Sequence, residues 1–137
     1  MAGYSGTPLP KKLGIKENSC VLLIDSPPEV RADLKTALAS CRTSKDRREP
    51  LDFSLIFVKS AADLKKKFSE VARQLAPAGI LWVSWPKKTS GVATDLDENE
   101  VRRIGLASGL VDVKVCAVND VWSGLKFVIR VKDRVKA

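Results

Sequence analysis

The chain has 137 residues and a formal net charge of +8, from 24 Lys and Arg residues against 16 Asp and Glu, and it contains no histidine. Without histidine, Ser-His-Asp and Cys-His catalysis and any metal site with imidazole ligands are excluded. No apolar run reaches the roughly 18 residues of a membrane span, so no association with a membrane is expected.

The cysteines and the N-terminal residues indicate in which cellular compartment the protein is expected to lie. Cys20, Cys41 and Cys116 lack the spacing of a zinc site or of a disulfide framework. We interpret them as reduced thiols and expect no metal site. The first residues also lack the continuous apolar segment of a secretory signal. Together these features favour a cytoplasmic location.

The first part of the chain predicts an arm, a strand and a helix. Residues 1–12 are rich in glycine, proline and small polar residues, and they predict an N-terminal arm with one helical turn near its end. The apolar run 20–24 predicts a strand covered on both faces. Ser26, Pro27 and Glu29 then have the spacing of a capping box. The apolar stripe of the helix follows at Val30, Leu34, Ala37, Leu38 and Cys41.

The middle of the chain repeats the alternation of strand and helix. Residues 42–50 are charged and predict a loop, and the apolar run 53–58 predicts a second strand. Ser60 is the expected N-cap of the next helix, which residues 77–79 end. The apolar stripe of that helix is Leu64, Phe68, Val71 and Leu75.

Residues 80–85 predict a third strand, with Trp82 in the core, and 86–95 form a loop. Asp97 then caps a helix that Gly109 closes. Beyond it, apolar and polar residues alternate on both sides of Asn119-Asp120, which predicts an antiparallel pair of strands with one wetter face. The order β-α-β-α-β-α-β-β predicts a single α/β domain over residues 1–137. Its architecture is a three-layer Rossmann-like sandwich, with three parallel strands and a C-terminal antiparallel hairpin.

This order of elements resembles the class I methyltransferase fold with its middle removed. The stretches GYSGTPLPKKLGI, LWVSWPKK and WSGLKFVIR together resemble a small bacterial family of domains of unknown function. The cofactor site of the methyltransferase fold needs a glycine-rich turn after the first strand. Here that turn is 25–29, where two prolines remove backbone N–H donors and Asp25 and Glu29 add negative charge. We therefore expect neither S-adenosylmethionine nor a dinucleotide as cofactor.

A ligand site is expected at the carboxyl ends of the parallel strands, where open α/β sheets bind their ligands. The 86–95 segment follows one of these ends, and we interpret it as a loop at the edge of that site. In this hypothesis Lys87 and Lys88 pair with an anionic group, and Trp85 or Trp122 supplies a flat apolar wall. The candidate ligand-binding residues are Lys59, Ser60, Trp85, Lys87, Lys88, Thr89, Ser90, Asp95, Trp122 and Ser123.

Each of these residues also has a structural interpretation. Trp85 and Trp122 can close the end of the sandwich as core residues, and Lys87 and Lys88 can be solvated loop charges. Thr94, Asp95 and Asp97 can serve the N-terminus of the fourth helix. The glycines of the arm, with Tyr4, can fold over the strand ends.

Three functions remain open at this point. We favour a non-catalytic, methyltransferase-like domain that binds an anionic small ligand or a protein partner at the strand ends, with no catalytic residue assigned. The net charge of +8 permits a nucleic-acid-binding protein, although its basic residues are scattered. The third possibility is an enzyme that uses Lys87 or Lys88 with Asp95 on an anionic substrate. The sequence does not indicate an oligomeric state.

Overall fold

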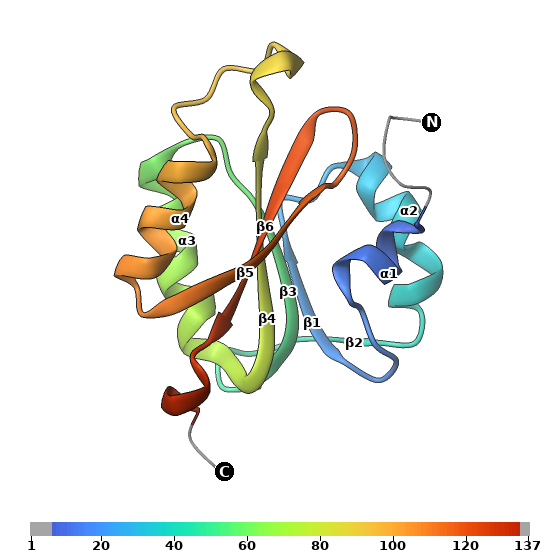
Figure 1. The fold of residues 1–137 in the computed structure, drawn as a ribbon. Helices are drawn as coiled ribbons and strands as arrows, with labels where there is room; N and C mark the ends of the chain where they lie inside the picture. Colours follow the sequence, from blue (N-terminus) through green and yellow to red (C-terminus); the bar gives the residue numbers. More distant parts are fainter. Residues whose placement is uncertain (1–6, 135–137) are drawn as a thin grey trace.

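The computed structural model describes residues 7–134, which form a six-stranded mixed sheet between two layers of helices (Figure 1). The strand order is β2-β1-β3-β4-β6-β5. The elements are α1 (Leu9–Leu13), β1 (Cys20–Ile24), α2 (Pro28–Leu38), β2 (Arg42–Thr43), β3 (Leu51–Phe57), α3 (Ala61–Gln74), β4 (Leu75–Pro86), the 3-10 helix η1 (Lys88–Ser90), α4 (Glu98–Ala107), β5 (Leu110–Ala117), β6 (Trp122–Ile129) and the 3-10 helix η2 (Val131–Asp133).

The parallel part of the sheet confirms the predicted fold class and adds one strand to it. The strands β1, β3 and β4 run parallel, as their continuous apolar runs predicted. The predicted loop 42–50, however, begins with β2, which pairs in parallel with β1. The amide of Arg42 donates to the carbonyl of Ser19 at 2.8 Å. Both residues of β2 are exposed at the edge of the sheet, so no apolar pattern marks them.

The C-terminal hairpin is antiparallel as predicted, but its alternation is interrupted. The register between β5 and β6 shifts between Asp112 and Lys114, which inserts Val113 as an extra residue. Val113 and Val115 are 53% and 46% exposed on this edge strand. The predicted apolar set of β5 therefore does not all point into the core.

The helix caps are confirmed at two of the three predicted positions. Ser60 accepts the amide of Asp63 at 3.1 Å, and Asp97 accepts the amide of Glu100 at 2.8 Å. The capping box at Ser26 was wrong, because α2 starts one residue later, with Pro27 as N-cap and no side-chain cap. The hydroxyl of Ser26 is instead buried without a hydrogen-bond partner among the described residues.

The helix α3 also ends earlier than predicted. Its last residue is Gln74, and β4 begins at Leu75 rather than Ile80. Gly79 permits this long strand, since a Cβ at that position would lie 2.4 Å from the carbonyl oxygen of Leu51. The predicted arm, 1–12, extends beyond the described residues; within them, α1 covers Leu9–Leu13.

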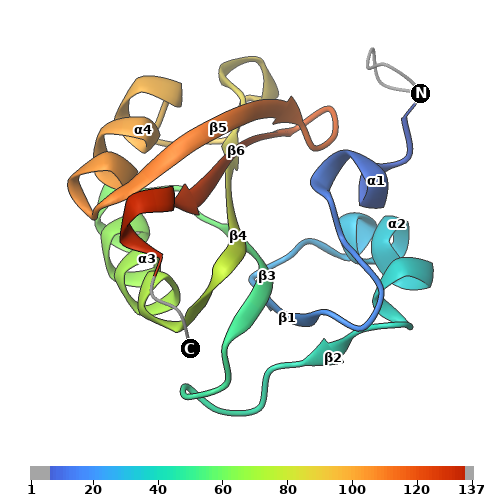
Figure 2. The same cartoon turned by 60° about the horizontal axis from the view of Figure 1, so that its bottom comes forward.

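Two hydrophobic clusters hold the layers to the sheet. Helices α3 and α4 cover one face and α1 and α2 the other, as Figures 1 and 2 show. On the α3–α4 face, the rings of Phe68 and Phe127 meet edge to face at 5.1 Å. Gly105 of α4 packs directly on Phe127, because a Cβ there would lie 2.0 Å from that ring. The opposite cluster includes Leu13, Leu34, Phe53 and Trp82.

Trp82 joins the N-terminal segment to the centre of the sheet. Its side chain is fully buried, as predicted, and its indole N–H donates to the carbonyl of Leu13 at 2.8 Å. Gly124 on the neighbouring strand lies against the indole, where a Cβ would be 3.2 Å from the ring. This hydrogen bond fixes the end of α1 on the sheet.

Replacing Trp82 with Phe is expected to lower the free energy of unfolding by about 2–4 kcal/mol, because it leaves a buried carbonyl unpaired and opens a small cavity. Urea denaturation followed by circular dichroism measures the loss. Trp85→Phe is the matched control, since Trp85 is also buried but its indole makes no hydrogen bond to a described residue. Equal losses in the two variants would contradict the role assigned to the hydrogen bond.

Candidate functional site

A cavity of about 490 Å³ lies at the carboxyl ends of β1 and β3, where the sequence predicted a ligand site. We call it the strand-end cavity. The two strands supply its floor, and the starts of α2 and α3 flank it. Its lining residues are Asp25, Pro27, Phe57, Val58, Lys59, Ser60, Asp63 and Trp122.

Trp122 forms the aromatic wall of the strand-end cavity. It begins β6, which runs antiparallel to β4, so its position matches the end of that strand at Pro86. Its ring meets that of Phe57 edge to face, with 5.0 Å between the ring centres. Trp122 is 8% exposed, so most of the indole is packed and a small part faces the cavity.

Trp85 belongs to the core instead. It is 5% exposed and lies in the cluster on the α3–α4 face, together with Val58 and Leu96. Since successive residues of a strand point to opposite faces, Trp85 and Trp122 lie on opposite sides of the sheet. Ser123 pairs with Trp85 in the register of β4 and β6 and does not line the cavity. Of the two predicted aromatic walls, Trp122 is therefore the one at the cavity.

An ion-pair group stands at one side of the cavity. The ammonium of Lys67 forms ion pairs with Asp25, at the end of β1, and with Asp63 of α3, the latter at 2.9 Å. Burial lowers the pKa of Lys67, but the hydrogen bonds to both carboxylates outweigh it, and the pKa lies above its usual value. The ammonium therefore stays protonated and ties the end of β1 to α3.

The N-terminus of α3 is already occupied by side chains of the chain itself. Ser60 accepts the amide of Asp63, and Asp95 accepts the amide of Ala61 at 2.8 Å. Thr94 donates its hydroxyl to the carbonyl of Lys59 at 2.6 Å. Of the three residues predicted to serve the start of α4, Asp97 caps it and Thr94 accepts the amide of Leu96 just before it at 3.1 Å. The prediction was wrong for Asp95, which binds the start of α3.

The basic part of the predicted loop does not reach the cavity. Lys87 donates its amide to the carbonyl of Val121 at 2.7 Å, and Lys88, Thr89 and Ser90 form η1. The segment projects beyond the end of the sheet (Figure 1). None of these residues lines the strand-end cavity. Of the predicted residues, the fold brings Lys59, Ser60 and Trp122 together at the cavity. Asp25, Phe57 and Asp63 also line it, although none of them was among the candidate ligand-binding residues.

The turn between β1 and α2 does not fit the cofactor of the methyltransferase fold. Asp25 has a positive φ of 57°, and Pro27 and Pro28, which have no N–H groups, occupy the N-cap and first helical positions. The amide of Val30 donates back to the carbonyl of Pro27 at 3.1 Å. The buried hydroxyl of Ser26 does not line the cavity. An anionic group would thus find carboxylates here in place of a backbone N–H cradle.

The fold is similar to that of S-adenosylmethionine-dependent methyltransferases. A methyltransferase from Aquifex aeolicus superimposes with a TM-score of 0.60 and 14% identity over 85% of each chain. Magnesium protoporphyrin IX methyltransferase from Synechocystis PCC 6803, with bound SAH, gives 0.56 and 13% over 82% of this chain and 74% of its own. LepI in complex with SAM gives 0.53 and 11% over 89% of this chain, which spans 39% of the LepI chain.

The family model described as protein of unknown function (DUF3052) matches residues 11–131, so the chain belongs to that family. No curated protein matches the sequence. Within residues 7–134 no helix has the length and apolar character to cross a membrane. The same residues contain no group of three or more His, Cys, Asp or Glu side chains placed to hold a metal ion.

S-adenosylmethionine is expected not to bind, because the β1–α2 turn offers carboxylates and prolines in place of the backbone N–H donors of a glycine-rich turn. A ligand present at about 100 times its Kd would stabilise the fold by about 2.7 kcal/mol, or raise the Tm by about 10 °C. Thermal unfolding with and without the cofactor measures this shift. A rise of that size, reduced in Asp25→Ala, would overturn our interpretation of the turn.

Proposed function

We propose that the chain is a non-catalytic, methyltransferase-like domain that binds a small molecule in the strand-end cavity. The proposal depends on one observation: the cavity lies beside a β1–α2 turn in which prolines replace the glycine-rich, N–H-donating loop of a nucleotide site. The volume of about 490 Å³ lies in the usual range for small-molecule sites. The cavity also occupies the edge of the sheet where α/β proteins bind their ligands.

Two buried hydroxyls lie near this edge of the sheet, although neither lines the cavity. Among the described residues, the side chains of Ser26 and Ser84 are buried without any hydrogen-bond partner. Ser26 follows β1, and Ser84 lies two residues before the end of β4. A buried polar group without a partner costs about 1–3 kcal/mol, so the two hydroxyls lower the stability of these strand ends and are not counted among the ligand-binding groups.

The lining residues favour a ligand with a flat apolar part and hydrogen-bond donors. Trp122 and Phe57 supply the apolar surface, and Asp25 and Asp63 supply acceptors. The sequence predicted an anionic ligand because of Lys87 and Lys88, which do not line the cavity. Lys59 also lines it, together with the two carboxylates. We therefore propose a neutral or cationic molecule with hydroxyl or amino groups.

The ionisable groups support a binding role over catalysis. A lysine that acts as nucleophile or base needs a lowered pKa. The pKa of Lys67 is raised instead, and its ammonium is bound to both carboxylates of the cavity wall. Neither Asp25 nor Asp63 is then positioned as an unengaged proton acceptor. A protein partner and a cytoplasmic location remain proposals on sequence grounds.

Trp122 provides the test, because a ligand in the strand-end cavity changes its fluorescence. A library of small aromatic amines and alcohols is screened by tryptophan fluorescence and thermal unfolding. We expect hits whose fluorescence change disappears in Trp122→Phe and whose affinity falls about tenfold in Asp25→Asn, the loss of one charge-assisted hydrogen bond.

Trp85→Phe is the control, since Trp85 lies on the other face of the sheet and its replacement should leave the signal intact. The proposal fails if every hit retains its fluorescence change in Trp122→Phe. It also fails if the library contains no ligand that raises the Tm.

A further inference from the structure

A second hollow of about 450 Å³ lies between α1 and β5, apart from the strand-end cavity. We call it the lysine pocket. Figures 1 and 2 both show the end of the β5–β6 hairpin beside α1. Three lysines and no acidic residue line the pocket. The lining residues are Thr7, Lys11, Lys12, Lys114, Val115, Cys116 and Ala117.

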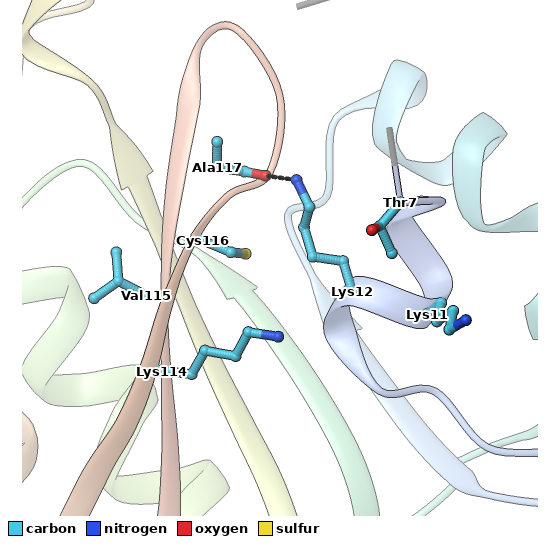
Figure 3. Close-up of a pocket in the computed structure, with 7 residues that line it drawn as sticks. All are labelled: Thr7, Lys11, Lys12, Lys114, Val115, Cys116 and Ala117. Carbon is cyan, nitrogen blue, oxygen red and sulfur yellow. Dashed lines mark hydrogen bonds between the residues drawn. The ribbon is translucent and has the colours of Figure 1, made fainter. Parts of the chain in front are cut away.

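The lysine side chains approach the pocket from two elements that are far apart in the sequence (Figure 3). Lys12 extends from α1 toward β5, and its ammonium donates to the carbonyl of Ala117 at 3.0 Å. Lys114 extends from β5 toward α1, and the thiol of Cys116 points to the same side. Lys11 points away from β5, so it lies at the outer edge.

The positive charge of this region is not balanced by the described part of the protein. Lys114 lies directly opposite Lys126 in the register of β5 and β6, and like charges in that position repel each other. Neither side chain forms an ion pair with any residue in 7–134, although Arg42, Arg102 and Arg103 all do.

The environment of Cys116 is consistent with a positive field in the pocket. Burial raises the pKa of the Cys116 thiol, while the charges of Lys12, Lys114 and Lys87 act in the opposite direction. Lys87, outside the lining set, therefore adds to the same field. A cationic hollow with a partly apolar floor is suited to an anion.

We propose that the lysine pocket binds the phosphate or pyrophosphate group of a small molecule. Ammonium groups bind phosphates as point charges without demanding a planar geometry, and a bound dianion would relieve the repulsion between Lys114 and Lys126. No aromatic side chain lines the pocket for the stacking of bases, which favours a small phosphorylated molecule over a single-stranded nucleic acid. The site is independent of the strand-end cavity.

Titration calorimetry of the whole chain with pyrophosphate at low salt tests the site. We expect Lys114→Gln to weaken binding by about tenfold or more, the effect of losing one contact to a charged group. Lys11→Gln should have a smaller effect because that lysine points away from β5. Lys66→Gln removes the same charge from an exposed position on α3 and should leave the affinity within about twofold.

Thermal unfolding gives a second readout that does not depend on calorimetry. Without ligand, Lys114→Gln should raise the Tm slightly and Lys66→Gln should not, because only the first relieves the repulsion with Lys126. With pyrophosphate, the Tm of the native chain should rise, and that of Lys114→Gln should rise clearly less.

Titrations with other ligands identify the source of the phosphate. Glycerol phosphate compared with pyrophosphate separates an organic ester from the inorganic ion, and binding of either one through Lys114 supports the site. The proposal is overturned if neither binds, or if Lys66→Gln weakens binding as much as Lys114→Gln. It is also overturned if a single-stranded oligonucleotide binds more tightly than both and loses affinity equally in the two variants, which would indicate a diffuse basic surface.

Discussion

The hydrogen bond from the Trp82 indole to the carbonyl of Leu13 joins residues 69 positions apart and fixes the N-terminal segment on the sheet. Gly124 on β6 leaves room for the indole, since a Cβ there would lie 3.2 Å from the ring. Because Leu13 ends α1, the same contact sets where Lys12 can reach Ala117. The lysine pocket therefore depends on a core tryptophan that does not line it. Trp122, the aromatic wall of the strand-end cavity, belongs to the same hydrophobic cluster as Trp82.

The strand-end cavity and the lysine pocket differ in the charge of their lining residues, although the chain as a whole has a net charge of +8. At the strand-end cavity, Asp25 and Asp63 hold Lys67 between them, so the excess positive charge of the protein does not appear there. At the lysine pocket, no carboxylate lines the walls. Net charge alone is therefore a poor guide to ligand preference in this protein. What decides is which charges the folded chain has already neutralised.

The sequence predicted best what depends on neighbouring residues. The strands at 20–24 and 53–58 and the caps at Ser60 and Asp97 follow from local patterns, and the structure confirms them. The capping box at Ser26 failed because Pro27-Pro28 determines where α2 begins. The lysine pocket could not be predicted, since it depends on a contact between Lys12 and Ala117 across 105 positions. Likewise, only the fold places Trp85 and Trp122 on opposite faces.

The starts of α2 and α3, which follow the parallel strands β1 and β3, do not offer an open backbone site for an anion. A helix that starts at the carboxyl end of a parallel strand attracts phosphate through its free N–H groups. Two prolines occupy the start of α2, and Ser60 and Asp95 take the amides at the start of α3. Any phosphate recognition must then come from side chains on elements other than these helix starts. The lysines of α1 and β5 meet this condition, since they line a hollow whose lining residues include no carboxylate.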